Sequence, residues 1–180
     1  MPVFIALLRA VNVGGGTQVP MATLRDRVSS AGYGRVRSVL QSGNLIFEGT
    51  ERPPETVERS LNATVAPTLG ARTEFFVRTL PEWRELVAGN PFPREARDDP
   101  AHLLVCVLRH TPTAAAWRTL AEAIPGRERV RGIGRAAYLV YPDGVGRSKL
   151  TARLIETCLG GPGTSRNWNT VRRLEELAAA

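Results

Sequence analysis

The chain has 180 residues, of which 43% are hydrophobic and 23% charged, and its formal net charge is +7. These values are ordinary for a globular protein that folds unaided around one substantial core or two small ones. No apolar stretch approaches the about 20 residues that cross a bilayer, and the first residues lack the charged region and apolar core of a signal peptide, so we expect a cytoplasmic protein without membrane contact.

The first half predicts the element order β-α-β-β-α-β. Leu24 and Val28 recur one helical turn apart, as do Val57 and Leu61 in the second predicted helix. The pair Ser42-Gly43 indicates a tight hairpin between two strands. The predicted elements are a strand over 3–9, a helix over 20–31, strands over 36–41 and 44–48, a helix over 54–69 and a strand over 72–80.

The second half restarts after a break at 90–93, where two prolines restrict the residues before them to extended backbone. A short helix over 81–88 is predicted before this break. The elements predicted after it are a strand over 103–109, a helix over 113–123, strands over 127–133 and 137–141, and helices over 148–159 and 169–179. We therefore expect an α+β fold of two ferredoxin-like subdomains in tandem, each a split βαβ with a mainly antiparallel sheet. Their expected bounds are 1–92 and 93–180, with an extra C-terminal helix.

Positive charge is concentrated in the C-terminal half, where the excess of basic over acidic residues is +5 against +2 in the first 90 residues. Such a field favours nucleic acid, nucleotides or other phosphorylated ligands. An arginine-rich proteome explains the bulk charge equally well. Lys149 is the only lysine beside 23 arginines, which marks its position as a site, with a leftover surface lysine as the plain alternative.

Two polar motifs in the first half are candidate binding segments. The run from Arg9 through Asn12, Gly14 and Gly15 leaves a strand and enters a helix, where glycines let backbone amides converge on an anion. It lacks the spacing of a P-loop or of a dinucleotide fold, and a flexible glycine connection is the alternative.

The second motif, Gln41-Ser42-Gly43-Asn44, gathers two amides and a hydroxyl around a turn. Serine, glycine and asparagine are also common in turns for conformational reasons alone.

The third motif, over 144–151, leads into a predicted helix with Ser148 as its expected N-cap. Arg147 and Lys149 flank that serine. Cations at a helix N-terminus oppose the helix dipole unless an anion is bound there, so this conflict points to a ligand.

The fourth motif precedes the last helix and contains Arg166, Asn167, Trp168 and Asn169. An arginine fork, two amides and an indole can hold a phosphate and stack on a base or sugar. The alternative is that the polar residues cap the helix while Trp168 packs beneath it. The alternating Arg127, Arg129 and Arg131 share one strand face that could track a phosphate backbone or simply form a solvated edge.

No persuasive catalytic set is present, because no nucleophile, histidine and carboxylate group together. His102 and His110 lack a nearby cysteine or carboxylate cluster, so we expect no metal and no cofactor. Cys106 and Cys158 are expected to be buried, reduced thiols.

Five motifs in order, the four above and the Asn90-Pro91-Phe92-Pro93 segment, resemble the bacterial domain-of-unknown-function 1697 family. The resemblance covers nearly the whole chain and implies a cytoplasmic α+β protein of two ferredoxin-like subdomains. That family has no established activity, so it supplies no catalytic residue. The chain departs from the pattern at Ala10, where glycine is more usual, and in the extra Gly16. The residues within its recurring motifs are Arg9, Asn12, Gln41, Asn44, Lys149, Arg166 and Asn167.

From these features we expect a protein that binds a phosphate-bearing ligand, nucleic acid or nucleotide, where the motifs of both halves converge. The alternatives are a small enzyme, in which Lys149 and Arg166 stabilise charge on a phosphorylated or carboxylated substrate, and a protein interaction module. The sequence predicts no oligomeric state.

Overall fold

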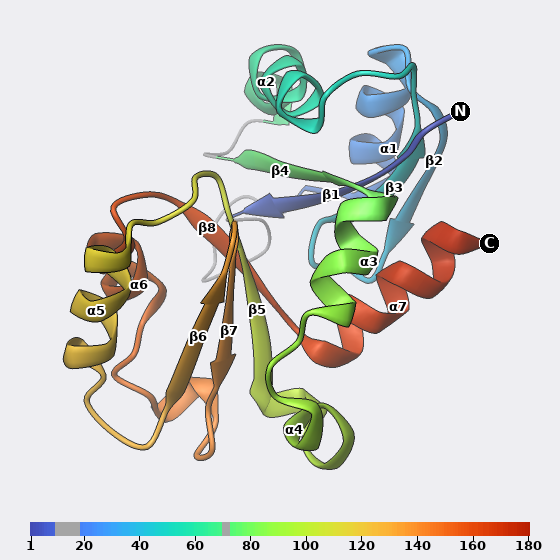
Figure 1. The fold of residues 1–180 in the computed structure, drawn as a ribbon. Helices are drawn as coiled ribbons and strands as arrows, with labels where there is room; N and C mark the ends of the chain where they lie inside the picture. The colour runs from blue at the N-terminus through green and yellow to red at the C-terminus, as the bar shows by residue number, and fades with distance from the viewer. Residues whose placement is uncertain (10–18, 70–72) are drawn as a thin grey trace. The chain divides into compact units, whose positions relative to one another are not determined.

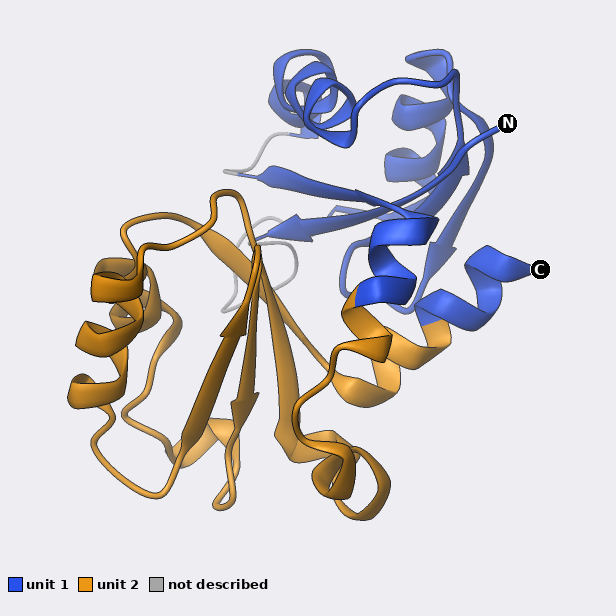
Figure 2. Ribbon diagram, viewed as in Figure 1, with its two compact units in different colours: residues 1–85, 174–180 blue, residues 86–173 orange. Residues whose placement is uncertain are grey.

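Two four-stranded antiparallel sheets organise the chain, one in each of two units (Figure 1). The computed structural model describes residues 1–9, 19–69 and 73–180. Unit 1 comprises Met1–Glu85 and Leu174–Ala180, and unit 2 comprises Leu86–Arg173 (Figure 2). The bounds expected from the sequence, 1–92 and 93–180, differ from these units. The boundary lies after Glu85, and the last helix contributes residues to both units.

Unit 1 has the predicted order β-α-β-β-α-β, and its sheet runs in the order β2-β3-β1-β4. Its elements are β1 (Val3–Arg9), α1 (Met21–Ser30), β2 (Gly34–Val39), β3 (Asn44–Glu48), α2 (Pro54–Thr64), the 3-10 helix η1 (Ala66–Leu69), β4 (Glu74–Thr79) and the start of α3 (Leu80–Ala88).

Helices α1 and α2 cover one face of this sheet (Figure 1). Leu24 and Val28 of α1 are fully buried, and Leu61 of α2 is fully buried beside them. They pack against the strand residues Phe4, Ala6, Leu8, Leu45, Phe47, Phe75 and Val77. Residues at alternate strand positions, such as Ile5 and Ile46, therefore belong to the opposite face of the sheet.

Polar side chains of α2 also close the outer edge of strand β4. The Asn62 amide donates to the Phe75 carbonyl (3.1 Å) and accepts from the Phe75 amide (2.7 Å). The buried carboxylate of Glu58 accepts from the Val77 amide at 2.8 Å. An edge strand whose outward groups are bonded in this way is protected against pairing with another chain.

Unit 2 repeats the order with sheet β6-β7-β5-β8. Its elements are α4 (Pro93–Asp98), the 3-10 helix η2 (Pro100–His102), β5 (Leu103–Leu108), α5 (Ala114–Ala123), β6 (Arg129–Ile133), β7 (Ala136–Val140), the 3-10 helix η3 (Val145–Arg147), α6 (Ala152–Leu159), β8 (Gly163–Asn167) and the first half of α7 (Trp168–Ala179). Helices α5 and α6 cover one sheet face (Figure 1), where Cys106, Leu108, Ala137 and Leu139 form the core with Leu120 and Ile155.

Several elements differ from the sequence-based expectation. Strand β8 was not predicted, because its residues were interpreted only as a binding motif. Helix α6 begins at Ala152 and not at Ser148. The break predicted at 90–93 is followed at once by α4 and η2, two short helices that were not predicted. Among the described residues, no helix is long and apolar enough to cross a membrane.

Candidate functional site

The turn between β2 and β3 is held by the side chain of Asn44, which is fully buried. Its amide donates to the Val39 carbonyl (2.9 Å) and to the Ser42 hydroxyl (2.8 Å). Gly43 has a φ of 76°, a value that favours glycine, and its carbonyl accepts from the Leu8 amide at 2.7 Å. Asn44 therefore has a structural role, whereas Gln41 and Ser42 are exposed at the turn.

Arg9 lies at the same end of sheet β2-β3-β1-β4 as this turn, because the end of antiparallel β1 pairs with the start of β3. Its guanidinium forms an ion pair with Glu74 of the neighbouring strand β4 (3.5 Å). The predicted site residues Asn12, Gly14 and Gly15 lie outside the described residues. Of the first two motifs, the structure thus brings together Arg9, Gln41 and Ser42 at one sheet end.

In unit 2 side-chain hydrogen bonds hold the connection between β7 and α6, residues 141–151, at two points. The Ser148 hydroxyl donates to the Glu128 carboxylate and accepts from the Leu150 amide at 3.0 Å. The buried Tyr141 hydroxyl donates to the Leu150 carbonyl at 3.0 Å, and Leu150 itself is 1% exposed. These contacts fix the backbone on both sides of Lys149.

Helix α6 is capped by Thr151, whose hydroxyl accepts from the Leu154 amide at 3.2 Å. Ser148 is therefore not the N-cap, contrary to the sequence-based expectation. Lys149 precedes the cap, and Arg153 is the cation within the first helical turn, which contains no acidic residue. The predicted conflict with the helix dipole is thus present, but a different residue carries it.

Three cations project from this connection and the start of α6: Arg147, Lys149 and Arg153. All three side chains are exposed. Within the described parts of the chain none of them has a side-chain hydrogen bond or ion pair. Arg153 was not identified from the sequence, because the helix was expected to begin at Ser148, which places Arg153 beyond its first turn.

The fourth motif forms the end of strand β8 and the start of α7. The Asn167 side chain accepts from the Thr170 amide at 3.0 Å and so caps α7. Trp168 is buried at 7% exposure, while Asn169 is exposed. Asn167 therefore caps the helix and Trp168 is buried, as the structural alternative for this motif predicts.

Arg166 donates from one nitrogen to the Thr164 hydroxyl (2.9 Å) and to the Ser165 carbonyl (2.8 Å). Burial lowers the pKa of this guanidinium to about 10, because removal from water disfavours its charged form.

Within unit 2, Arg166 and Lys149 do not meet on one face of the sheet. Arg166 pairs in register with Val105 of β5. The residue after Val105, Cys106, faces the core beneath α5 and α6. Since side chains alternate across a strand, Arg166 lies on the sheet face away from those helices. Leu150, next to Lys149, packs into the core on the helix side. The predicted convergence of motifs from the two halves of the chain stays a prediction.

The arginines of the β6 region are largely held by carboxylates. Arg127 precedes the strand and forms an ion pair with Asp143. Arg129 pairs with Glu95, lowering the pKa of that carboxyl, and lies over the Phe92 ring at 5.2 Å. Arg131 is exposed and unpaired within the described chain. This strand therefore does not present a continuous row of unpaired arginines.

The acidic partners Glu128 and Asp143 were not identified from the sequence, because each approaches its partner only through the fold. Among the described residues, no group of three or more histidine, cysteine or acidic side chains is arranged to hold a metal ion. Cys106 and Cys158 are both free thiols.

Comparisons with known proteins identify a family without an assigned activity. No curated protein matches the chain. A solved structure of the conserved bacterial protein SP0830 from Streptococcus pneumoniae is similar, with a TM-score of 0.74 and 19% identity over 98% of each chain, a likeness that shows the fold. A family model described as "Protein of unknown function (DUF1697)" matches residues 1–138, and the chain therefore belongs to the DUF1697 family.

Proposed function

We propose that unit 2 binds a phosphate-bearing ligand, a nucleotide or nucleic acid, through Arg147, Lys149 and Arg153. The observation that carries this proposal is the set of three exposed, unpaired cations on one fastened segment. A charged donor with no carboxylate partner is available for a phosphate oxygen, and such charge-assisted hydrogen bonds are stronger than neutral ones.

The backbone that carries the cations is held by side-chain contacts. The Ser148 hydroxyl donates to Glu128, and Arg147 and Lys149 on either side of Ser148 are exposed. Because the loop is held by Glu128, Tyr141 and Thr151, little backbone ordering is needed when an anion binds.

The same geometry favours binding over catalysis. The Ser148 hydroxyl is engaged as donor to Glu128 and as acceptor from the Leu150 amide, which suits a structural clamp and not an activated nucleophile. Lys149 is exposed and not desolvated. If the protein is an enzyme, it should turn over a phosphoester. If it is an interaction module, it should retain a protein partner and should itself have no affinity for phosphate compounds.

The experiment measures binding of ATP by calorimetry and of a short labelled oligouridylate RNA by fluorescence anisotropy, each at two salt concentrations. We expect affinity to fall as salt rises, because phosphate contacts release counterions. Lys149→Arg should weaken binding about tenfold, since a wide guanidinium replaces a compact point charge. Lys149→Ala combined with Arg147→Ala should weaken it further.

The matched control is Arg118→Ala, which removes an exposed arginine from α5 in the same unit. Equal affinities of wild type and the Arg147→Ala, Lys149→Ala double variant for both probes would contradict the proposal. Hydrolysis of ATP that stops in the double variant would favour the enzyme instead.

We also propose that each unit is ferredoxin-like, which the β-α-β-β-α-β order and the two equivalent sheet orders support. The cytoplasmic location expected from the sequence stays a prediction.

A further inference from the structure

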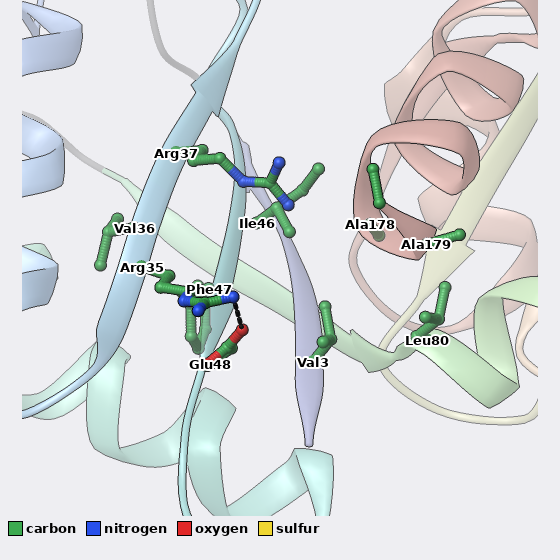
Figure 3. A pocket seen from close by; sticks show the side chains of 11 residues that line it. Val3, Arg35, Val36, Arg37, Ile46, Phe47, Glu48, Leu80, Ala178 and Ala179 are labelled. Atoms are coloured by element: carbon green, nitrogen blue, oxygen red, sulfur yellow. Dashed lines mark hydrogen bonds and ion pairs between the residues drawn. The ribbon is translucent and has the colours of Figure 1, made fainter. Parts of the chain in front are cut away.

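A pocket of about 560 Å³ lies in unit 1, on the sheet face away from α1 and α2 (Figure 3). Its apolar part is formed by Val3, Ile46 and Leu80, and by Ala178 of the last turn of α7. The volume is within the range of small-molecule sites, about 300 to 1,000 Å³. None of the motifs in the sequence analysis includes these residues.

Two arginines of β2 reach this pocket, and they are held differently. Arg37 donates to the Leu177 carbonyl at 2.7 Å, which uses one of the five N–H groups of its guanidinium. Arg35 forms an ion pair with Glu48 (3.3 Å), as Figure 3 shows. Among the charged side chains of the lining, Arg35 and Glu48 therefore offset each other, and Arg37 supplies the remaining donors.

The backbone at Arg35 is an independent sign of a built site. Its φ is 46°, in the left-handed region that a residue with a side chain rarely adopts. The pairing of β2 with β3 also shifts register between Gly34 and Arg37. Bulges of this kind redirect side chains and are frequent beside functional sites. Here the irregularity places both Arg35 and Arg37 along the pocket.

We propose that this pocket binds a small monocarboxylate with an apolar body. The donors of Arg37 that the Leu177 carbonyl does not use match the planar carboxylate fork. The apolar body then contacts Val3, Ile46, Leu80 and Ala178, where its burial contributes about 25 cal/mol for each Å². The proposal concerns unit 1 alone and does not depend on phosphate binding by unit 2.

The probe is decanoate, with decanol as its uncharged counterpart, and calorimetry measures both. We expect wild type to bind decanoate at least about tenfold more tightly than decanol, because only the carboxylate receives charge-assisted bonds. Arg37→Gln should remove that preference and leave decanol binding unchanged. Arg59→Gln, an exposed arginine of α2 that bonds to Thr56, is the matched control and should behave as wild type.

Arg37→Gln also removes the bond to Leu177, so a second variant tests the pocket without it. Ala178→Leu adds bulk at a helical position that lines the cavity, and should reduce binding of both probes. Backbone amide shifts on addition of decanoate should be largest at Val3, Ile46 and Ala178. Failure of wild type to bind decanoate, equal binding of both probes, or shifts confined to other residues would overturn the proposal. ATP and RNA binding should be unaffected by Arg37→Gln, which separates this site from the one in unit 2.

Discussion

The connections that lead into α2 and α6 occupy equivalent places in two units of the same element order, yet they differ in length and charge. Between β3 and α2 the chain has five residues, 49–53, and between β7 and α6 it has eleven, 141–151. The longer connection contains η3, the Ser148 clamp, Arg147 and Lys149. The added residues therefore bring both the fastening contacts and the free cations.

The two helices that follow also begin differently. The first turn of α2 contains Glu55, an acidic residue that complements the helix dipole, and Pro53 at its N-cap position makes no side-chain cap bond. The first turn of α6 contains no acidic residue, and Arg153 stands there behind the Thr151 cap. One topology thus supports one helix start with an acidic residue in its first turn and another with a cation there behind a threonine cap.

The largest expected effect comes from truncating Leu150, a buried residue of the longer connection. Leu150→Ala removes a side chain that is 1% exposed in the core of unit 2, and should lower the free energy of unfolding by about 2–5 kcal/mol. Chemical denaturation measures the change. Val145→Ala, on the same connection but 45% exposed, should change it by less than about 0.5 kcal/mol; similar losses in both would show that Leu150 is not an anchor.

Alkaline pH should weaken the same fastening through tyrosine. Burial raises the pKa of Tyr141 and of Tyr138 to about 12 from the ordinary value of 10. The folded state then keeps protons that the unfolded state loses, so stability is fully present below pH 10 and is lost as pH rises toward 12. Thermal unfolding across this window should show a smaller decline for Tyr141→Phe than for wild type. An identical decline would contradict the assignment.

The element order was predictable, because buried positions recur at the period of each element. Leu24 and Val28, or Val57 and Leu61, lie one turn apart and are buried as that spacing requires. Strand β8 was missed because Gly163–Asn167 has no apolar alternation. Among the described strands it pairs with β5 alone, at the edge of the sheet, where tertiary hydrogen bonding outweighs local preference.

The site was only partly predictable. Serine and threonine are both good N-cap residues, so the local sequence does not show whether Ser148 or Thr151 caps the helix. In the structure the Ser148 hydroxyl donates to Glu128, and Thr151 is the N-cap. The pocket residue Arg35 carries no local signal, since its positive φ arises with the irregular pairing of β2 and β3. Contacts between residues distant in sequence determine such positions.

A moderate effect is expected from removing the two hydrogen bonds of the Ser148 hydroxyl in the longer connection. Ser148→Ala leaves the Leu150 amide and one Glu128 oxygen without their present partner, which should cost about 1–3 kcal/mol. Denaturation measures the loss, and binding of ATP should weaken in parallel because Arg147 and Lys149 are no longer held. Ser148→Thr keeps a hydroxyl and should restore both properties; if ATP affinity is unchanged in Ser148→Ala, the clamp does not position the cations.

The smallest effect tests the charge difference between the two helix starts, and it should have opposite signs for stability and for binding. Arg153→Glu replaces the cation in the first turn of α6 by the kind of residue that α2 has there. An acidic residue at this position interacts favourably with the helix dipole, so the free energy of unfolding should rise by about 0.3–1 kcal/mol. Affinity for ATP should fall, because a like charge then faces the phosphates. The reciprocal Glu55→Arg in unit 1 should lower stability by a similar amount and leave ATP binding unchanged. Arg153→Glu that gains stability and keeps full ATP affinity would remove Arg153 from the site while leaving the dipole argument intact.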